Sequence, residues 1–482
     1  MNIGLSSIQE KKLNSNDDYL MNIQKLDDEL AGYFSTALAV DENLTRQLVS
    51  FQANKQRAHY RWYKYKEAFS HSLIEYLITK YKINKGKVLD PFAGAGTTLF
   101  TCSEFGYDAD GIELLPVGQK IIDANILVRS GYKKKIIDRL TYWNSEKIWN
   151  KEGDTKDFEV LRITQGAYPK DTELKIKRYL YDIEQENAEV REILLFALLC
   201  VLESISFTRK DGQYLRWDYR SGRRNGKNTF DKGSIFSFDE AITKKFGEIL
   251  FDISSMNPNS DLFSLIESNS GPGTVKIIKD SCLEVLPSIR ARKYSGIITS
   301  PPYCNRYDYT RTYALEHAIL GITESELLSL RQAMLSCTVE NKEKELGALN
   351  ANWTRALDIC DHQKLLQEIL NYLDYKKERK ELNNSGIARM VRGYFYEMAC
   401  VLQECHRILK KHGYMFMVND NVRYAGASIS VDLILSKIAE DLGFNIKHIL
   451  VLAQGKGNSS QQMGKHGREN LRKCVYVWQK EE

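Results

Sequence analysis

Ser300, Pro301, Pro302 and Tyr303 combine groups that can hold and stack a flat ring bearing an amine. They follow the apolar run Gly296-Ile297-Ile298, so they begin a loop at the carboxyl end of an expected strand. Two prolines fix the backbone and remove N–H donors, which leaves carbonyl oxygens free to accept hydrogen bonds. The Ser300 hydroxyl and the Pro301 carbonyl are candidate acceptors, and the Tyr303 ring is a candidate stacking surface. The alternative is a rigid strand-to-loop turn without chemistry.

A glycine-rich run lies upstream, in Asp90-Pro91-Phe92-Ala93-Gly94-Ala95-Gly96-Thr97-Thr98, between a short apolar strand and an apolar helix. Glycine lets the backbone approach a ligand closely, and a helix N-terminus favours a negative group such as a carboxylate. Glu113 ends the next expected strand, where it can accept hydrogen bonds from ribose hydroxyls. The alternative is a tight turn, and the run lacks the third glycine of the dinucleotide-binding pattern.

Both runs resemble motifs of the S-adenosylmethionine-dependent DNA amino-methyltransferases. The glycine-rich run is similar to their first motif, Asp-Pro-Phe-x-Gly-x-Gly-Thr-Thr, and Ser-Pro-Pro-Tyr is similar to their catalytic motif. The resemblance implies S-adenosylmethionine as cofactor and a Rossmann-like fold. It also implies a catalytic role for the four residues Ser300, Pro301, Pro302 and Tyr303.

Two weaker signals fit the same family. Asp280 follows Ile277-Ile278 and looks like the third motif, whose acidic residue contacts the adenine amine; the alternative is a turn residue at a strand end. The segment Arg61 to Ser70 resembles the motif that closes over the cofactor. The residues implied to contact the cofactor are Phe69, Ser70, Asp90, Pro91, Phe92, Ala93, Gly94, Gly96, Thr97, Glu113 and Asp280.

The first residue of the catalytic motif bears on the target base. An exocyclic amine is a poor nucleophile because its lone pair is delocalised into the ring, so a site that accepts both amine hydrogens favours transfer. The base must leave the duplex to reach such a site. Serine at position 300 resembles cytosine-N4 enzymes more than adenine-N6 enzymes, which usually carry Asp or Asn there. The alternatives are an adenine-N6 enzyme, an RNA amine methyltransferase, and a non-catalytic nucleic-acid-binding subunit.

A basic and aromatic segment between Phe207 and Gly233 is the candidate DNA-contacting region. Arginine and lysine neutralise phosphates, and aromatic rings can stack where a base has left. The alternative is a solvated loop with a few rings in the core. Arg306 and Arg311 can contact phosphates beside the flipped nucleotide, or can pair with Asp308 or Glu316. The residues expected to contact DNA are Arg209, Lys210, Tyr214, Arg216, Trp217, Arg220, Arg223, Arg224, Arg306 and Arg311.

The elements that must position these residues alternate between strand and helix along the chain. This alternation predicts an α/β fold with a doubly wound, mostly parallel sheet, two helical insertions, and a C-terminal antiparallel hairpin at the sheet edge. The predicted division is a helical extension at 1–56, the cofactor-binding part of the core at 57–125, a helical and basic insertion at 126–271 as candidate DNA-recognition region, the catalytic part at 272–321, a helical insertion at 322–389 and the C-terminal part of the core at 390–482.

The composition is ordinary for a globular protein and compatible with a polyanionic partner. Of the 482 residues, 43% are hydrophobic and 27% are charged, with a net charge of +5. Nine dispersed cysteines predict reduced thiols, and no spacing indicates a metal site. No secretory signal or membrane span is evident, so we expect a cytoplasmic protein without a membrane partner. The resemblance implies duplex DNA as partner, beside a restriction endonuclease or another defence component.

Overall fold

The computed structural model describes residues 16–211, 214–223, 229–255, 271–453, 456–457 and 470–482. The strands of its central sheet are β1 (Leu38–Asp41), β2 (Lys87–Asp90), β3 (Asp108–Ile112), β6 (Val275–Ile278), β7 (Tyr294–Thr299), β8 (Leu409–Asp420), β11 (Phe444–Leu452) and β14 (Lys473–Lys480). Across the described part of the sheet their order is β1-β11-β14-β8-β7-β2-β3-β6. Only β14 runs antiparallel to its neighbours there, and the other neighbouring pairs are parallel. The predicted Rossmann-like, mostly parallel sheet is confirmed.

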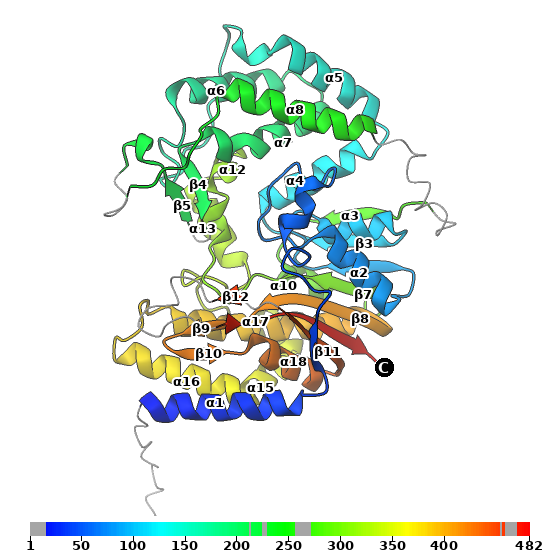
Figure 1. Cartoon of the computed structure of the whole chain (residues 1–482), viewed down its shortest axis with the longest axis vertical. Helices are drawn as coiled ribbons and strands as arrows, with labels where there is room; N and C mark the ends of the chain where they lie inside the picture. Colours follow the sequence, from blue (N-terminus) through cyan, green and yellow to red (C-terminus); the bar gives the residue numbers. More distant parts are fainter. Residues whose placement is uncertain (1–15, 212–213, 224–228, 256–270, 454–455, 458–469) are drawn as a thin grey trace, which may run out of the picture.

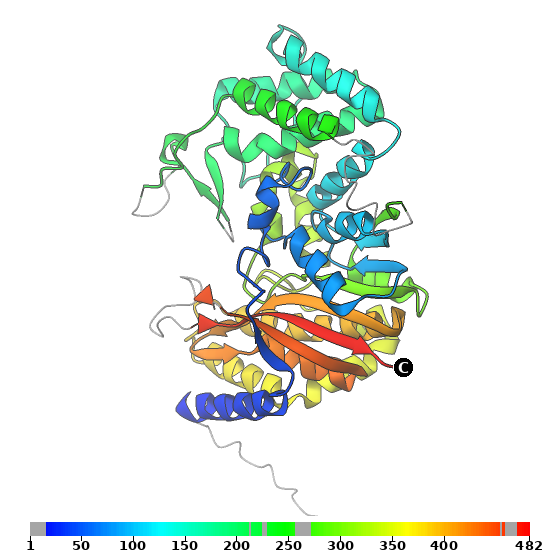
Figure 2. The same cartoon turned by 45° about the vertical axis from the view of Figure 1, so that its right-hand side comes forward.

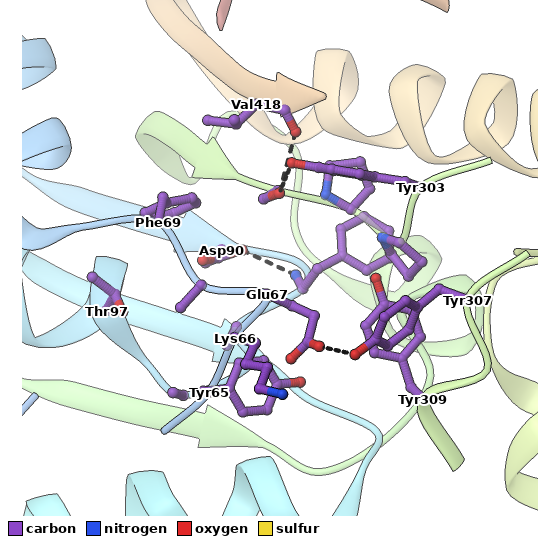
Figure 3. Close-up of a pocket in the computed structure, with 18 of the residues that line it drawn as sticks. Tyr65, Lys66, Glu67, Phe69, Asp90, Thr97, Tyr303, Tyr307, Tyr309 and Val418 are labelled. Carbon is purple, nitrogen blue, oxygen red and sulfur yellow. Dashed lines mark hydrogen bonds between the residues drawn. The ribbon is translucent and has the colours of Figure 1, made fainter. Parts of the chain in front are cut away.

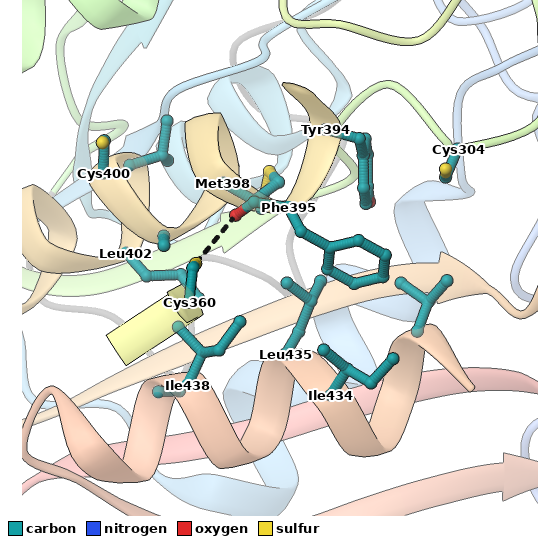
Figure 4. Close-up of a cluster of buried hydrophobic side chains, with 14 of the residues drawn as sticks. Cys304, Cys360, Tyr394, Phe395, Met398, Cys400, Leu402, Ile434, Leu435 and Ile438 are labelled. Carbon is teal, nitrogen blue, oxygen red and sulfur yellow. Dashed lines mark hydrogen bonds between the residues drawn. The ribbon is translucent and has the colours of Figure 1, made fainter. Parts of the chain in front are cut away.

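Alternate residues of the central strands face two different layers of helices, as the pleat of a strand requires. Phe416 and Val418 on β8 face the layer of α2 (His71–Tyr81) and α3 (Thr97–Glu104), whereas Met415 and Met417 face α17 (Ile387–Ile408) and α18 (Val431–Asp441). Figure 4 shows this second core, where side chains of α17 and α18 meet. All nine cysteines lie in described residues and are free thiols, and Cys360 and Cys400 fill space in this core.

The first insertion is a helical layer with a core of its own. It contains α5 (Lys133–Glu146), α6 (Lys170–Ile183), α7 (Ala188–Ile205), α8 (Phe238–Ser255) and a hairpin of β4 (Thr208–Asp211) with β5 (Tyr214–Trp217). Trp143, Trp149 and Tyr179 are buried among these helices. Figures 1 and 2 show this layer at one end of the molecule, joined to the sheet through α4 (Pro116–Val128) and α12 (Ala314–Ile319).

The second insertion divides between two places. Its helices are α13 (Glu324–Ala333), α14 (Leu346–Leu349), α15 (Thr354–His362) and α16 (Lys364–Glu378). α15 and α16 pack on α17, and α16 also packs on the N-terminal helix α1 (Asn16–Tyr33), at the opposite end of the molecule from α5 to α8. α13 instead contacts α11 (Tyr309–Thr312), close to the loop that follows β7.

Short elements complete the described chain. They are η1 (Phe51–Gln56), η2 (Ile148–Asn150), η3 (Tyr219–Ser221), α10 (Cys282–Val285), η4 (Leu286–Ser288), η5 (Ala351–Trp353), β9 (Val422–Tyr424), β10 (Ala427–Ile429), β12 (Lys456–Gly457) and β13 (Asn470–Leu471). Among the described residues, no helix combines the length and the apolar character that crossing a bilayer requires.

The arrangement of the last strands corrects one expectation. β11 and β14 are antiparallel neighbours as predicted, but they do not form the edge of the sheet. β14 lies between β11 and β8 because both of its faces are apolar: Val475 and Tyr476 are fully buried in opposite cores. The edge beside β11 is β1, which comes from the extension that we expected to be helical throughout.

Candidate active site

The carboxyl ends of β2, β7 and β8 meet at a cavity of about 840 Å³. The cavity is lined by nine of the eleven residues expected to contact the cofactor and by all four expected catalytic residues. Figure 3 shows Tyr303, Tyr307 and Tyr309 along one side, across from Phe69, Asp90 and Thr97. Motifs that lie about 200 residues apart in the chain therefore share one enclosure, as parallel strands in a doubly wound sheet allow.

Asp90 fixes the start of the glycine-rich loop. Its carboxylate accepts hydrogen bonds from the Phe92 amide at 3.0 Å, from Thr299 Oγ1 at 2.6 Å and from Thr98 Oγ1 at 2.7 Å. Burial raises the pKa of Asp90 to about 6, although these hydrogen bonds act to lower it. Asp90 thus ties the loop to β7, the strand that leads to Ser300.

Glu113 holds the other side of the same loop. Its carboxylate accepts hydrogen bonds from the Gly94 amide at 2.6 Å and from the Leu115 amide at 2.7 Å. Burial raises the pKa of Glu113 to about 7. Gly94 is in the left-handed region with φ of +53°, and a β-carbon on Gly118 would lie only 2.6 Å from the Gly94 carbonyl oxygen. The loop and the first turn of α4 therefore form a close-fitting backbone cradle around this carboxylate.

Two of the expected cofactor residues lie outside the cavity lining. Ser70 caps α2: its Oγ accepts from the Leu73 amide at 3.1 Å and donates to the Leu48 carbonyl. The expectation of cofactor contact is therefore corrected for the Ser70 side chain, while the neighbouring Phe69 does line the cavity. Gly96 caps the start of α3 in the left-handed conformation, and a β-carbon there would lie 2.8 Å from the Phe100 ring. Asp280 follows β6 and lies exposed at the rim.

Ser300 directly follows β7 and lines the cavity. Its Oγ donates to the Val418 carbonyl at 3.2 Å and lies 3.1 Å from the Tyr303 hydroxyl. Burial raises the pKa of Tyr303, so its hydroxyl stays protonated at neutral pH. Pro301 and Pro302 complete this corner of the cavity, next to the end of β8.

The sequence did not single out several other groups that line the cavity. Lys473, at the start of β14, lies 3.1 Å from the Asp420 carboxylate and 3.5 Å from the Tyr303 hydroxyl. Asp420 ends β8 just as Asp90 ends β2, so the rule of a polar residue at a strand's carboxyl end could have identified it. Lys473 carried no such signal, because its place depends on the insertion of β14 beside β8.

An aromatic wall was also missed. The rings of Tyr307 and Tyr309 lie 4.7 Å apart, and the Tyr307 hydroxyl donates to the Glu67 carboxylate. Tyr313 donates to the same carboxylate and stacks on Tyr65 at 5.1 Å. The segment before Phe69 and the loop after Tyr303 are thus joined across the cavity. The run Tyr307-Asp308-Tyr309, which begins four residues after the last position of the catalytic motif, was the available signal.

The β4–β5 hairpin divides the expected DNA-contacting residues between its two faces. Arg209 and Arg216 lie opposite each other and are exposed. The expectation is corrected for Lys210 and Trp217, which point inward because strand residues alternate. Lys210 is 4% exposed, and its ammonium lies 2.6 Å from the buried carboxylate of Glu316. Lys210 therefore anchors the hairpin to α12.

The residues after the hairpin are largely engaged within the protein. The Arg220 guanidinium donates to Asp218 at 2.6 Å and 2.9 Å, and Arg223 lies over the Trp217 ring at 3.9 Å from its centroid. Both guanidinium groups remain partly solvent-accessible. Arg224 and the side chain of Tyr214 lie outside the described residues.

The two arginines after the catalytic motif differ in their surroundings. Arg311 pairs with Asp308 at 3.3 Å and with Glu340 at 3.1 Å, so the alternative of ion pairing within the protein applies to it. Arg306 has φ of +65°, and its guanidinium lies 3.4 Å from the Asn383 side-chain oxygen. Arg306 is thus partly exposed and lies on the loop that follows Tyr303 at the cavity.

Comparison with known proteins gives a consistent result. A family model described as DNA methylase matches residues 9–122. The chain is 55% identical over 465 residues to the Type II methyltransferase M.AvaI of Nostoc sp., covering 96% of this chain and 95% of that protein. It is 40% identical over 467 residues to the Type II methyltransferase M.BsoBI of Geobacillus stearothermophilus, covering 91% and 89%. A more distant relative, M.MjaII of Methanocaldococcus jannaschii, is 28% identical over 363 residues. Together with the Ser-Pro-Pro-Tyr corner and the glycine-rich cradle, these matches show that the chain belongs to the family of DNA amino-methyltransferases.

Proposed function

We propose that this DNA amino-methyltransferase transfers a methyl group from S-adenosylmethionine to N4 of a cytosine that has left the duplex. The observation that carries the proposal is the single cavity shared by the Asp90–Gly94 loop and the Ser300–Tyr303 corner. Residues 65–69, the glycine-rich loop and the loop after β7 all line this cavity around Ser300. A base stacked in a duplex therefore cannot reach Ser300 and must flip out. Because the relatives are named Type II methyltransferases, we also propose a role as the modification enzyme beside a restriction endonuclease.

The residues present fit S-adenosylmethionine. The backbone of the glycine-rich loop packs closely on the first turn of α4, since a β-carbon at Gly118 would lie 2.6 Å from the Gly94 carbonyl oxygen. Glu113 offers a buried carboxylate for ribose hydroxyls, Asp280 offers an acceptor for the adenine amine at the rim, and Phe69 offers an apolar surface. When bound, the cofactor would supply an electrophilic methyl group on a positively charged sulfur; the sulfur would leave as a neutral thioether, and the amine would release one of its two protons to solvent.

Ser300 and Pro301 are proposed to hold the amine. Because the Ser300 hydroxyl donates to the Val418 carbonyl at 3.2 Å, its lone pairs can accept a hydrogen bond from an amine N–H. The Pro301 carbonyl is the second acceptor. With both amine hydrogens accepted in one geometry, the nitrogen lone pair is aligned toward the methyl group rather than delocalised in the ring. The Tyr303 ring stacks on the base.

The preference for cytosine N4 over adenine N6 is supported by Ser300. The hydroxyl is short and neutral, whereas adenine-N6 enzymes usually carry Asp or Asn at the first position of the motif.

DNA contact is proposed for the exposed face of the β4–β5 hairpin. Arg209 and Arg216 are directly opposite each other, an arrangement that repulsion disfavours unless an anion lies between or beside them. Arg216 also lies 4.1 Å from the centroid of the Phe230 ring and 3.3 Å from Asp211. The Asp211 carboxylate offsets part of this repulsion and a phosphate beside the pair would offset the rest, while Arg306 would contact the strand near the flipped base.

The test compares Tyr303→Ala with Tyr303→Phe. Tyr303→Ala removes the stacking ring, so we expect loss of methyl transfer to unmodified duplex DNA with S-adenosylmethionine binding retained. Tyr303→Phe keeps the ring and should retain most of the activity. Full turnover by Tyr303→Ala would refute the assignment of this corner as the base site.

A further inference from the structure

We infer that Lys473, backed by Asp420, is the residue that distinguishes cytosine from adenine in the target pocket, by donating a hydrogen bond to the C2 carbonyl of cytosine. This inference rests on the proposed function, and it names how the same pocket selects its base. Lys473 and Asp420 lie outside the catalytic motif, on β14 and β8.

The two residues extend a row of polar side chains along the carboxyl edge of the sheet. Ser300, Asp420 and Lys473 each lie at the end of an apolar strand and project on the face covered by α2 and α3, since strand residues alternate. The buried residues of that same face, each two positions from one of the three, are Ile298, Val418 and Val475. Lys473 is in register with Asp420, so their positions are fixed by the ladder between β8 and β14.

Direct contacts link Lys473 to the catalytic corner. Its ammonium lies 3.1 Å from Asp420 Oδ1 and 3.5 Å from the Tyr303 hydroxyl, and that hydroxyl lies 3.1 Å from Ser300 Oγ. All four residues line the cavity. An ammonium has three N–H donors, and within the described residues these two contacts leave one donor for a ligand.

The order of these groups along the edge matches the order of groups on cytosine. Asp90 and the glycine-rich loop lie on one side of Ser300, and Lys473 lies on the other. A base whose amine is held at Ser300 and faces the loop must therefore extend its remaining edge toward Lys473. On cytosine that edge presents the amine, the ring N3 acceptor and then the C2 carbonyl. Adenine presents an amine, the ring N1 acceptor and then a C–H group, so it offers no third acceptor.

Selection follows from this difference at the third position. With cytosine the ammonium gains a charge-assisted hydrogen bond, whereas with adenine it is desolvated against a C–H group. Asp420 compensates the charge, so the ammonium does not draw electron density from the amine as an isolated cation would. Burial acts to lower the pKa of Lys473, but Asp420 and Tyr303 together raise it above the ordinary value, so the donor stays protonated. The adjacent carboxylate also makes this lysine a poor phosphate contact.

The test uses a neutral pair, because removing one partner of this partly buried ion pair leaves the other uncompensated. Lys473→Met combined with Asp420→Asn is assayed on unmodified plasmid DNA with S-adenosylmethionine, and both methylated nucleosides are quantified by mass spectrometry. We expect the kcat/KM for N4-methylcytosine to fall by about 10- to 100-fold, the loss typical of a hydrogen bond to a charged group. The fraction of N6-methyladenine should rise, and the Kd for S-adenosylmethionine should not change.

The matched control is Lys120→Met combined with Glu192→Gln. These residues form a partly buried ion pair of 2.6 Å between α4 and α7 and do not line the cavity, so its removal should leave the product ratio unchanged. Lys473→Arg, which keeps the charge, should retain the cytosine preference if the double variant does not fold. A double variant with wild-type kcat/KM and product ratio would overturn the inference, as would an equal loss of cofactor binding and methyl transfer. A wild-type enzyme that makes N6-methyladenine would instead refute the assignment of cytosine N4 as the target, on which this inference rests.

Discussion

Gly118 offers a sharp test of the cofactor cradle. In the Gly118→Ala variant, the new β-carbon would lie 2.6 Å from the Gly94 carbonyl oxygen and 2.8 Å from Glu113 Cγ. Alanine gains about 1 kcal/mol of helix propensity over glycine in α4, but overpacking of this kind costs about 1–3 kcal/mol. The strain can be relieved by moving the Gly94 loop or the Glu113 carboxylate, and both are proposed to hold the cofactor. We predict a 10- to 100-fold weaker Kd for S-adenosylmethionine, which corresponds to about 1.4–2.8 kcal/mol.

Calorimetric titration with S-adenosylmethionine and thermal unfolding of the same samples measure both effects. Gly247→Ala is the matched control, because Gly247 lies within α8 and a β-carbon there meets nothing within 4 Å. It should stabilise the protein by about 0.5–1 kcal/mol and leave cofactor binding unchanged. If Gly118→Ala binds the cofactor as tightly as the wild-type protein does, the Gly94–Glu113 cradle is not the cofactor site.

Three further predictions concern charge. The pKa of Glu113 is raised to about 7, so the stabilisation that comes from its protonated form is present in full below the unfolded pKa near 4.5 and is lost as the pH rises through 7. Glu113→Gln cannot titrate and does not lose this contribution. In chemical unfolding between pH 5 and 8, its free energy of unfolding should therefore rise by about 1–3 kcal/mol relative to that of the wild type. Lys210→Met leaves the buried carboxylate of Glu316 unpaired and should destabilise the fold by about 3–5 kcal/mol in the same assay. Arg209→Ala should leave stability unchanged but weaken DNA binding and reduce the salt dependence by about one phosphate contact, as measured by titration at several salt concentrations; an unchanged salt slope would remove the hairpin from the DNA interface.

The strands that carry the site could be predicted because burial on both faces of a parallel sheet requires continuous apolar runs. β7, whose six residues are all buried, was located in this way, and its carboxyl end gave Ser300. β6 is an edge strand and only partly buried, but three of its four residues are β-branched and apolar, which located it and Asp280 after it. The glycine-rich loop was identifiable for a different reason, because the backbone at Gly94 has a positive φ, which favours glycine. Gly118 is also constrained, because a β-carbon there would lie 2.6 Å from the Gly94 carbonyl oxygen.

Features that depend on long-range pairing could not be predicted. β1 has only four residues, of which Ala39 and Val40 are exposed, and its pairing with β11 makes it a strand. Lys473 enters the cavity because β14 is inserted between β11 and β8. Lys210 looked like a DNA contact because it lies in a basic segment, but its side chain is directed inward by strand alternation and is paired with Glu316, which lies more than 100 residues further along the chain.

The most direct test of the account is the identity of the methylated nucleoside. The wild-type protein is incubated with unmodified duplex DNA and S-adenosylmethionine labelled in its methyl group, and the digested product is analysed by mass spectrometry. We expect label in N4-methylcytosine. Label in N6-methyladenine would contradict the assignment of cytosine to the corner formed by Ser300 and Tyr303, and an absence of label in DNA would contradict the proposed function itself.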